Sequence, residues 1–263
     1  MARLGPPTGD DLRSRLSATG CSPGTFLGLQ SPVAAEIAGL AGLEWVVLDL
    51  EHGGGTAADV GPTVAAAAGY DVAVIVRVPR PDRAMIGWVA DQGAAGIMVP
   101  RIESVDEARE VAGFFSYPPD GERGVASYTR AAGWGQKKLT DLPRPVYMPQ
   151  IETPGALSDV DHIAALPEVD ALFIGPLDLS FALGVPGKLS DEGFLNAFRQ
   201  TVQAGATHRI PVGSIAPSHE RAEVMVADGV NFVALGSDGL WLRQSLGESA
   251  EALRNWSQNE RAE

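Results

Sequence analysis

The chain has 263 residues but a single cysteine, Cys21, and little positive charge. One thiol can form neither an internal disulfide bond nor a metal site built from cysteines. Asp and Glu number 33 against 20 Lys and Arg, a formal net charge of −13. Nucleic acids and anionic membranes bind cationic surfaces, so this balance argues against both as partners. Small anionic substrates are not excluded, because they respond to the local field.

Long apolar runs are also missing. No stretch of 18 or more apolar residues is present, and the first ten residues lack the apolar core of a secretory signal. No Gly-x-Gly-x-x-Gly follows the first expected strand, which weakens a dinucleotide-binding interpretation. Hydrophobic residues make up 45% and charged residues 20%, as in proteins that bury a sizeable core. We therefore expect a soluble, cytoplasmic protein.

Short apolar runs alternate with longer helical patterns along the whole chain. The expected strands are residues 26–30, 45–50, 73–78, 96–100, 145–151, 171–175, 211–215 and 232–236. Their continuous apolar character is typical of strands covered on both faces. Segments 104–115 and 191–208 have helical spacing. Eight such units in about 240 residues predict one (β/α)₈ TIM barrel, with a doubly wound open sheet as the competitor.

The predicted organisation has three parts. Residues 1–24 form an N-terminal extension with a first helix, residues 25–256 form the barrel, and residues 257–263 form a flexible tail. One long irregular segment, residues 116–144, contains several glycines, arginines and aromatic residues. A segment of that length in a compact domain is usually functional or a lid, and this composition suits covering an anionic ligand.

Two acidic residues follow consecutive expected strands. Glu152 lies directly after residues 145–151, and Asp178 lies shortly after residues 171–175. The carboxyl ends of parallel strands meet at one rim, so these carboxylates should face each other and repel. A divalent cation between them relieves the repulsion, and oxygen ligands suit Mg²⁺ or Mn²⁺. The spacing predicts a metal-assisted enzyme.

Other polar residues end strands on the same predicted rim. His52 near Asp49 suggests a base oriented by a carboxylate, although a histidine in a surface turn is the plainer alternative. Arg77 emerges from an apolar strand, where a guanidinium needs an anionic partner. It is either a structural pair with Asp49 or Glu152, or a cation that stabilises a developing oxyanion. We favour the second interpretation.

Glycine-rich turns accompany these residues. The turns at residues 53–55 and at Gly175-Pro176 allow a ligand to approach the backbone closely. The amides of Leu177 and Asp178 are candidates to bind a carboxylate. We expect Glu51 to point away from the pocket or to form a structural ion pair. No lysine ends an expected strand, which argues against a Schiff-base aldolase.

Five motifs in order resemble the HpcH/HpaI family of class II, metal-dependent pyruvate aldolases in the phosphoenolpyruvate/pyruvate barrel superfamily. They are WVVLDLEHG (45–53), VPRIESVDEAR (99–109), GERGV (121–125), QIET (150–153) and FIGPLDLS (173–180). The resemblance covers about residues 25–245. Leu177, the glycines after His52 and the 126–140 stretch depart from the family pattern, which bears on the aldehyde partner more than on the pyruvate half.

The resemblance implies a role for each matching residue. Glu152 and Asp178 match the metal ligands, with Mg²⁺, Mn²⁺ or Co²⁺ as the cofactor. The catalytic set is His52 held by Asp49, Arg77 on the keto oxygen of pyruvate, and Asp91 reaching the histidine of an adjacent subunit. The substrate set is Gln150, Gly175, Pro176, Leu177, Asp178 and Arg77. The resemblance also implies a hexamer, a dimer of trimers, with the last helix (about residues 240–253) exchanged between subunits.

Residues and resemblance predict the same chemistry. We expect an aldolase that reversibly cleaves a 4-hydroxy-2-oxo acid to pyruvate and an aldehyde through a metal-stabilised enolate. The alternatives are an oxaloacetate decarboxylase, a CoA-ester lyase, a phosphosugar-acid enzyme using Gly213-Ser214 and Gly236-Ser237, and a non-catalytic barrel subunit. A CoA lyase would need a basic surface track, which this acidic chain does not suggest.

Overall fold

All eight expected strands form in the computed structural model, which describes residues 5–259. They are parallel and close into a barrel in sequence order, β1 to β8, with β8 pairing back to β1. The (β/α)₈ barrel prediction is confirmed. The strands are β1 Ser22–Leu27, β2 Trp45–Asp49, β3 Ala73–Arg77, β4 Gly96–Val99, β5 Val146–Ile151, β6 Leu172–Ile174, β7 Val212–Ala216 and β8 Phe232–Ser237.

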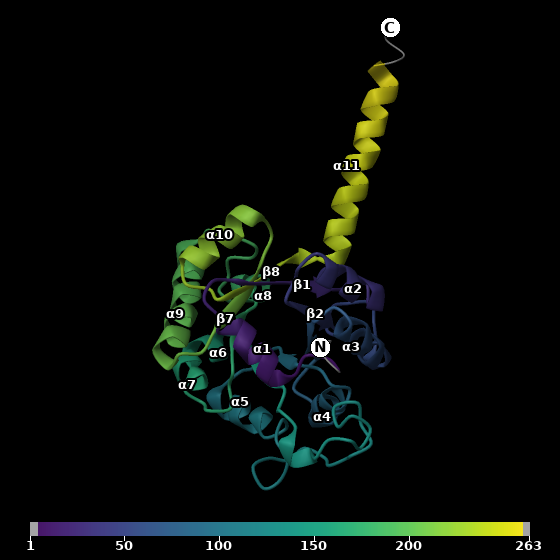
Figure 1. The fold of residues 1–263 in the computed structure, drawn as a ribbon. Coiled ribbons are helices and arrows are strands. Elements are labelled where there is room, and N and C mark those ends of the chain that lie inside the picture. The colour runs from purple at the N-terminus through teal and green to yellow at the C-terminus, as the bar shows by residue number, and fades with distance from the viewer. Residues whose placement is uncertain (1–4, 260–263) are drawn as a thin grey trace.

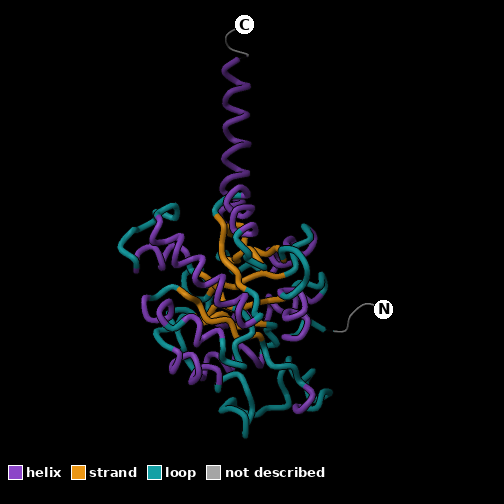
Figure 2. Tube along the Cα trace, turned by 90° about the vertical axis from the view of Figure 1, so that its left-hand side faces the viewer, coloured by secondary structure: helices purple, strands orange, loops and turns teal. Residues whose placement is uncertain are grey.

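Helices surround the strands on all sides (Figure 2). They are α1 Gly9–Leu16, α2 Pro32–Leu40, α3 Val60–Ala68, α4 Arg83–Asp91, α5 Val105–Ala112, α6 Pro154–Ser158, α7 Val160–Ala164, α8 Pro176–Ala182, α9 Glu192–His208, α10 His219–Ala227 and α11 Asp238–Asn259. Within residues 5–259, no helix is both long and apolar enough to span a bilayer.

Side chains alternate along each strand between two cores. Trp45, Val47 and Ile75 belong to the cluster that fills the barrel, whereas Val46 and Leu48 belong to the layer between strands and helices. This period of two is intrinsic to a strand. It explains why the runs are apolar throughout. It also directs the residue that ends each strand on the inward register toward the mouth of the barrel.

The first strand begins at Ser22, four residues before the predicted strand and within the expected extension of residues 1–24. Pro23-Gly24 looks like a turn, but a Cβ on Gly24 would lie 2.3 Å from the indole of Trp45, so the strand needs glycine there. The strand ends at Leu27 because the Asp238 carboxylate accepts the amide of Gly28 at 2.8 Å. At the other end, residues 257–259 of the predicted tail belong to α11, and residues 260–263 lie outside the described residues.

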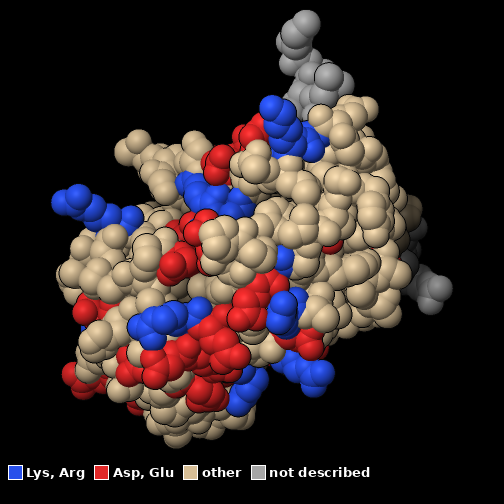
Figure 3. Space-filling view, turned by 90° about the horizontal axis from the view of Figure 1, so that it is seen from below, with Lys and Arg blue, Asp and Glu red and all other residues tan. Residues whose placement is uncertain are grey.

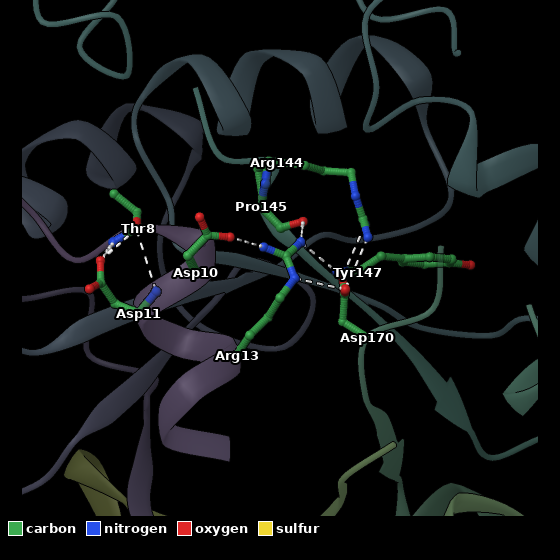
Figure 4. A network of polar contacts seen from close by, with 8 residues as sticks. All are labelled: Thr8, Asp10, Asp11, Arg13, Arg144, Pro145, Tyr147 and Asp170. Carbon is green, nitrogen blue, oxygen red and sulfur yellow. Dashed lines mark hydrogen bonds and ion pairs between the residues drawn. The ribbon is translucent and has the colours of Figure 1, made fainter. Parts of the chain in front are cut away.

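Helix α1 closes the amino-terminal end of the barrel and lies in front of it in Figure 1. Its Leu12 and Leu16 are fully buried in the core inside the barrel. Arg13 donates to Asp170 at 2.8 Å and to the carbonyl of Pro145 at 3.3 Å (Figure 4). Arg144 also donates to Asp170, at 2.9 Å. Asp170 therefore ties α1 to the entries of β5 and β6.

The long irregular segment is not a lid over the mouth of its own barrel. It follows α5 and leads into β5, so it lies at the amino-terminal end of the strands, opposite the rim where the candidate residues gather. It contains a short 3₁₀ turn at Leu139–Asp141 but is otherwise irregular. Helix α11 follows β8 directly, so it begins at the carboxyl end of the strands, and it projects away from the barrel (Figure 1).

Candidate active site

The ends of β2 and β3 bring Asp49 and Arg77 together. The two residues are paired in register across the strands, and both side chains are about nine-tenths buried. Arg77 Nε donates to Asp49 Oδ1 at 2.9 Å, and Nη2 donates to Oδ2 at 2.7 Å. Nη1 lies 3.1 Å from Glu51 Oε2. The guanidinium thus forms a bidentate pair with one acid and a second ion pair with another.

The charges of this group depend on one another. Burial alone would raise the pKa of Asp49, but the hydrogen bonds and charge of Arg77 outweigh it and hold that pKa below its ordinary value. Burial raises the pKa of Glu51, and Arg77 offsets only part of the effect. Desolvation works against the charged guanidinium, yet its three acidic neighbours raise the pKa of Arg77. Arg77 is a permanent cation at the mouth of the barrel.

Glu152 lies directly after β5, and its carboxylate is fixed by two donors. Oε1 accepts the backbone N–H of Arg101 at 2.7 Å, and Oε2 accepts Nε2 of Gln150 at 3.1 Å. Arg101 has φ 55°, an uncommon left-handed conformation, at the point where its amide meets the carboxylate. A Cβ on Gly175 would lie 2.3 Å from Glu152 Oε2, so the turn before α8 needs glycine.

Glu152 is unusually reluctant to ionise. Burial raises its pKa to about 7, and the charges of Asp178 and Glu51 add to the rise against the opposing Arg101 amide and Arg77 charge. Asp178, in the first turn of α8, is solvent-exposed. The amides of Leu177 and Asp178 belong to the same turn, where helical N–H groups have no partner within the helix. Gln150 is 1% exposed, and its Oε1 accepts no hydrogen bond within residues 5–259.

This donor set fits a hard divalent cation. No cluster of three or more His, Cys, Asp or Glu side chains with metal-binding geometry occurs within residues 5–259, so a fully protein-built cage is not available. Mg²⁺ commonly needs only one or two carboxylates, with water and substrate oxygens completing its shell. A cation between Glu152 and Asp178 would also remove the repulsion that raises the pKa of Glu152.

His52 is placed differently from expectation. Its side chain is 64% exposed, and Nε2 lies 3.8 Å from Glu51 Oε2. Asp49 does not contact the imidazole in this structure. Its Oδ1 accepts the backbone amides of Glu51 and His52 at 3.0 and 3.2 Å, and Arg77 occupies the rest of the carboxylate. Asp49 therefore holds the turn that carries His52, and the nearest acid to the ring is Glu51.

Asp91 is remote from this site. It ends α4, whose carboxyl end lies at the amino-terminal end of the barrel, and it forms an ion pair with Arg123 at 2.6 Å. It does not meet His52 within one chain. The serine and glycine of the phosphate alternative are also displaced: Gly213 lies inside β7 against Phe232, and Ser214 donates to the carbonyl of Ile174 at 3.1 Å. Gly236-Ser237, the other half of that alternative, ends β8 at the mouth, where Ser237 Oγ accepts the amide of Leu240 at 3.3 Å.

Two side chains near the mouth make contacts to which the sequence assigned no functional role. Glu51 forms an ion pair with Arg77, the second of the two outcomes expected for it, and does not point away from the pocket. The alternation that turns Trp45, Val47 and Asp49 inward would also turn Glu51 inward if extended by two residues. Gln30 is buried, and its Nε2 donates to the carbonyl of Asp49 at 2.6 Å. A Cβ on Gly53 would lie 2.4 Å from that Nε2, so Gln30 packs directly under the turn of His52.

A closed parallel barrel with its acids and an arginine at the carboxyl ends of the strands has the layout of a barrel enzyme. Residues 23–245 match the HpcH/HpaI aldolase/citrate lyase family, and the chain belongs to that family as an enzyme. A hydroxypyruvate/pyruvate aldolase of Paraburkholderia phytofirmans is 35% identical over 253 residues, covering 93% of this chain and 97% of the relative.

Two further likenesses agree. A 5-keto-4-deoxy-D-glucarate aldolase of Shigella dysenteriae is 34% identical over 235 residues, covering 86% of this chain and 90% of that protein. The crystal structure of an HpcH/HpaI aldolase/citrate lyase family protein from Burkholderia cenocepacia superposes with a TM-score of 0.88 at 30% identity, covering 92% of this chain and 98% of the other. The family resemblance seen in the motifs is confirmed.

Proposed function

We propose that the chain is a divalent-metal-dependent aldolase that reversibly cleaves a 4-hydroxy-2-oxo acid to pyruvate and an aldehyde. One observation supports the proposal: the buried Glu152 lies within the influence of the charges of Asp178 and Arg77, and its pKa is raised to about 7. The names of the two aldolase relatives support the same class of reaction.

The cation would be held by Glu152 and Asp178, and when bound it would act as a Lewis acid that draws negative charge toward a 2-oxo acid. Mg²⁺, Mn²⁺ and Co²⁺ all suit two carboxylates and water. Gln150 would lie beside the substrate with its buried, unpartnered Oε1, and the amides of Leu177 and Asp178 in the first turn of α8 would orient the carboxylate of pyruvate.

Arg77 would stabilise the oxyanion that develops on the keto oxygen as the carbon–carbon bond breaks. Asp49 fixes the guanidinium in place through two hydrogen bonds, so little reorganisation is needed during the reaction. Glu51 lies on the same guanidinium and faces His52. We propose that Glu51 orients the imidazole. Asp49 cannot do so, because its carboxylate is already bound to Arg77 and to two backbone amides.

His52 would be the acid and base. In the cleavage direction, a neutral imidazole nitrogen removes the proton from the C4 hydroxyl, the aldehyde leaves, and the electron pair of the broken bond remains on the pyruvate enolate. A proton then returns to the methyl carbon. The exposure of His52 suits a group that exchanges protons with solvent and substrate.

Deuterium exchange into the methyl group of pyruvate tests the proposal. We expect NMR to show exchange in D₂O with Mg²⁺ or Mn²⁺, and loss of exchange with EDTA or in Glu152→Gln. Glu110→Gln, an exposed acid on α5, is the matched control and should exchange like the wild type. Absence of exchange with every divalent ion tried would overturn the proposal and leave a CoA-ester lyase or a non-catalytic barrel.

The alternatives have distinct outcomes. An oxaloacetate decarboxylase would also exchange the methyl protons, but it would release CO₂ from oxaloacetate and give no product with any aldehyde in a screen. A CoA-ester lyase needs a basic surface for the nucleotide. On the face shown in Figure 3, acidic side chains form a contiguous patch with basic side chains scattered around it, so this face offers no such basic surface.

We propose, in addition, a cytoplasmic hexamer with α11 exchanged between subunits. Leu242, Leu246 and Leu253 lie on one side of α11 and are 53, 61 and 64% exposed. An apolar groove of about 590 Å³ between β1, α2 and the start of α11 could receive such a helix from another copy. In this assembly Asp91 would approach a partner's active site.

Light scattering of the full chain tests the assembly. We expect Leu246→Glu to reduce the particle mass, because it places a charge on the apolar side of α11. Gln244→Glu lies on the opposite side of the helix at 100° per residue and should leave the mass unchanged. A monomeric wild type would refute the assembly without affecting the exchange experiment above.

A further inference from the structure

A small pocket lies at the amino-terminal end of the barrel, opposite the acids of the mouth. It has a cavity volume of about 50 Å³, and we call it the basal pocket. Its walls are the start of α1 at Thr8 and Gly9, the residues that follow α4 at Gly93, and the long segment before β5. The network in Figure 4 borders it, since Thr8 and Pro145 belong to both.

The basal pocket is lined by three cationic side chains and no carboxylate: Arg123, Arg130 and Lys137. This is unexpected in a chain with a net charge of −13. The arginines of the neighbouring network, Arg13 and Arg144, are both paired with Asp170. Within residues 5–259, by contrast, neither Arg130 nor Lys137 has an acidic partner. The positive charges of Arg130 and Lys137 are therefore not compensated by an ion pair among the described residues.

Arg123 adds a buried donor. Its side chain is 4% exposed and stacks on Tyr117, with Nη2 bound to Asp91 at 2.6 Å, but Nε has no hydrogen-bond partner among the described residues. Arg130 Nε is also buried without a partner, while its guanidinium lies over the ring of Trp134 at 5.9 Å. A buried donor left unpaired is costly, and more so when it is charged.

We propose that the basal pocket binds one tetrahedral oxyanion of the size of phosphate or sulfate. Guanidinium N–H groups and an ammonium are the groups that proteins use for such anions. A volume of about 50 Å³ exceeds that needed for one water and matches a single small oxyanion rather than a nucleotide. The bound anion would accept from Arg123 Nε and Arg130 Nε and would neutralise Lys137.

The ligand would join three parts of the fold. Arg123, Arg130 and Lys137 come from the long segment, whereas the opposite walls come from α1 and from the end of α4. Binding to the folded chain alone stabilises it in proportion to ligand concentration. The anion would therefore hold the long segment against the base of the barrel. The lining of the basal pocket shares no residue with the mouth of the same chain, so a failed phosphate titration would leave the aldolase proposal standing.

Titration of the metal-free enzyme with inorganic phosphate tests the inference. Calorimetry would be run in EDTA at fixed ionic strength, and thermal unfolding would be followed in parallel. We expect saturable binding to the wild type and a rise in Tm. Arg130→Gln should weaken binding by about tenfold or more, which is the effect of losing one charge-assisted hydrogen bond. Phosphate should also slow proteolysis between residues 124 and 138.

The adjacent lysines provide a matched pair. Lys137→Gln should weaken phosphate binding several-fold, whereas Lys138→Gln should bind like the wild type, because only Lys137 lines the pocket. Both lysines are exposed, so this pair decides the matter even if Arg130→Gln folds poorly. Sulfate should compete with phosphate, and acetate should not.

Three results would overturn the inference. A calorimetric heat of phosphate binding that does not saturate with phosphate concentration would show that the pocket holds water alone. Equal binding by the two lysine variants would place the anion elsewhere. Binding that is lost in Arg77→Lys but kept in Lys137→Gln would place the anion at the mouth of the barrel.

Discussion

Replacing Glu152 by glutamine should change how the stability of the metal-free protein depends on pH. The pKa of this buried carboxyl is raised from an ordinary 4.5 to about 7. At 1.36 kcal/mol per pH unit, that interval corresponds to about 3 kcal/mol of unfavourable free energy for the ionised form. Glutamine has similar shape and accepts the Arg101 amide equally well, but it carries no charge.

The sign follows from proton linkage. Above pH 4.5 the unfolded chain releases the proton, while the folded chain retains it until about pH 7. The free energy of unfolding of the wild type should therefore fall as pH rises through this range and level off above it. Relative to the wild type, Glu152→Gln should gain about 2 kcal/mol between pH 5 and pH 8, or roughly 4–8 °C in Tm.

Thermal and urea unfolding in EDTA at pH 5, 6, 7 and 8 would measure this difference, and other titrating groups cancel in the comparison. Saturating Mg²⁺ should remove the fall in the wild type, because a cation favours the ionised carboxylate. Its affinity should rise with pH up to about 7 and then become constant. If the free energies of unfolding of the two metal-free proteins depend on pH in the same way, Glu152 is not a buried acid with a raised pKa.

Three further substitutions separate the roles at the mouth of the barrel. His52→Ala should lower kcat for aldol cleavage by about 10²- to 10⁴-fold while metal and pyruvate binding in calorimetry stay largely intact; unchanged turnover would remove His52 from the mechanism. Arg77→Met should lower the free energy of unfolding, measured by urea unfolding, by about 3–5 kcal/mol, because it leaves a buried carboxylate unpaired. A loss under about 1 kcal/mol would contradict the buried pair. Gly175→Ala should weaken Mn²⁺ binding by about tenfold or more, because the added Cβ would meet the Glu152 carboxylate. Gly87→Ala, which has open space around its Cβ, is the control. Equal Mn²⁺ affinities of the two variants would argue against crowding at Glu152.

Much of the architecture was predictable because parallel strands covered on both faces are apolar throughout. Seven of the eight strands lie within two residues of their predicted bounds, and β1 was misplaced by a glycine that makes room for Trp45. The position of the long segment was predictable in principle. A helix expected at residues 104–115 precedes it, and a segment between a helix and the next strand must lie at the amino-terminal end of a barrel.

The rim residues were predictable from strand order, but their pairings were not. Sequence placed His52 next to Asp49, yet the carboxylate is taken by Arg77 from the neighbouring strand and by two local amides. Competition among partners in three dimensions decides such contacts, and chain proximity does not reveal it. Contacts between subunits, such as the one expected for Asp91, depend on a surface that one chain does not contain.

Contacts that stabilise the fold and residues of the candidate active site lie at opposite ends of this barrel. The ties that close its base, from Arg13 and Arg144 to Asp170, share no residue with the mouth where Glu152 and Arg77 lie. Stabilising changes around Arg13, Arg144 and Asp170 can therefore be screened without loss of turnover, which is uncommon where active-site strain limits stability. Variants that accept other aldehydes can then be sought by substituting exposed positions at the mouth, such as Leu177, in a protein already stabilised at the amino-terminal end of the barrel.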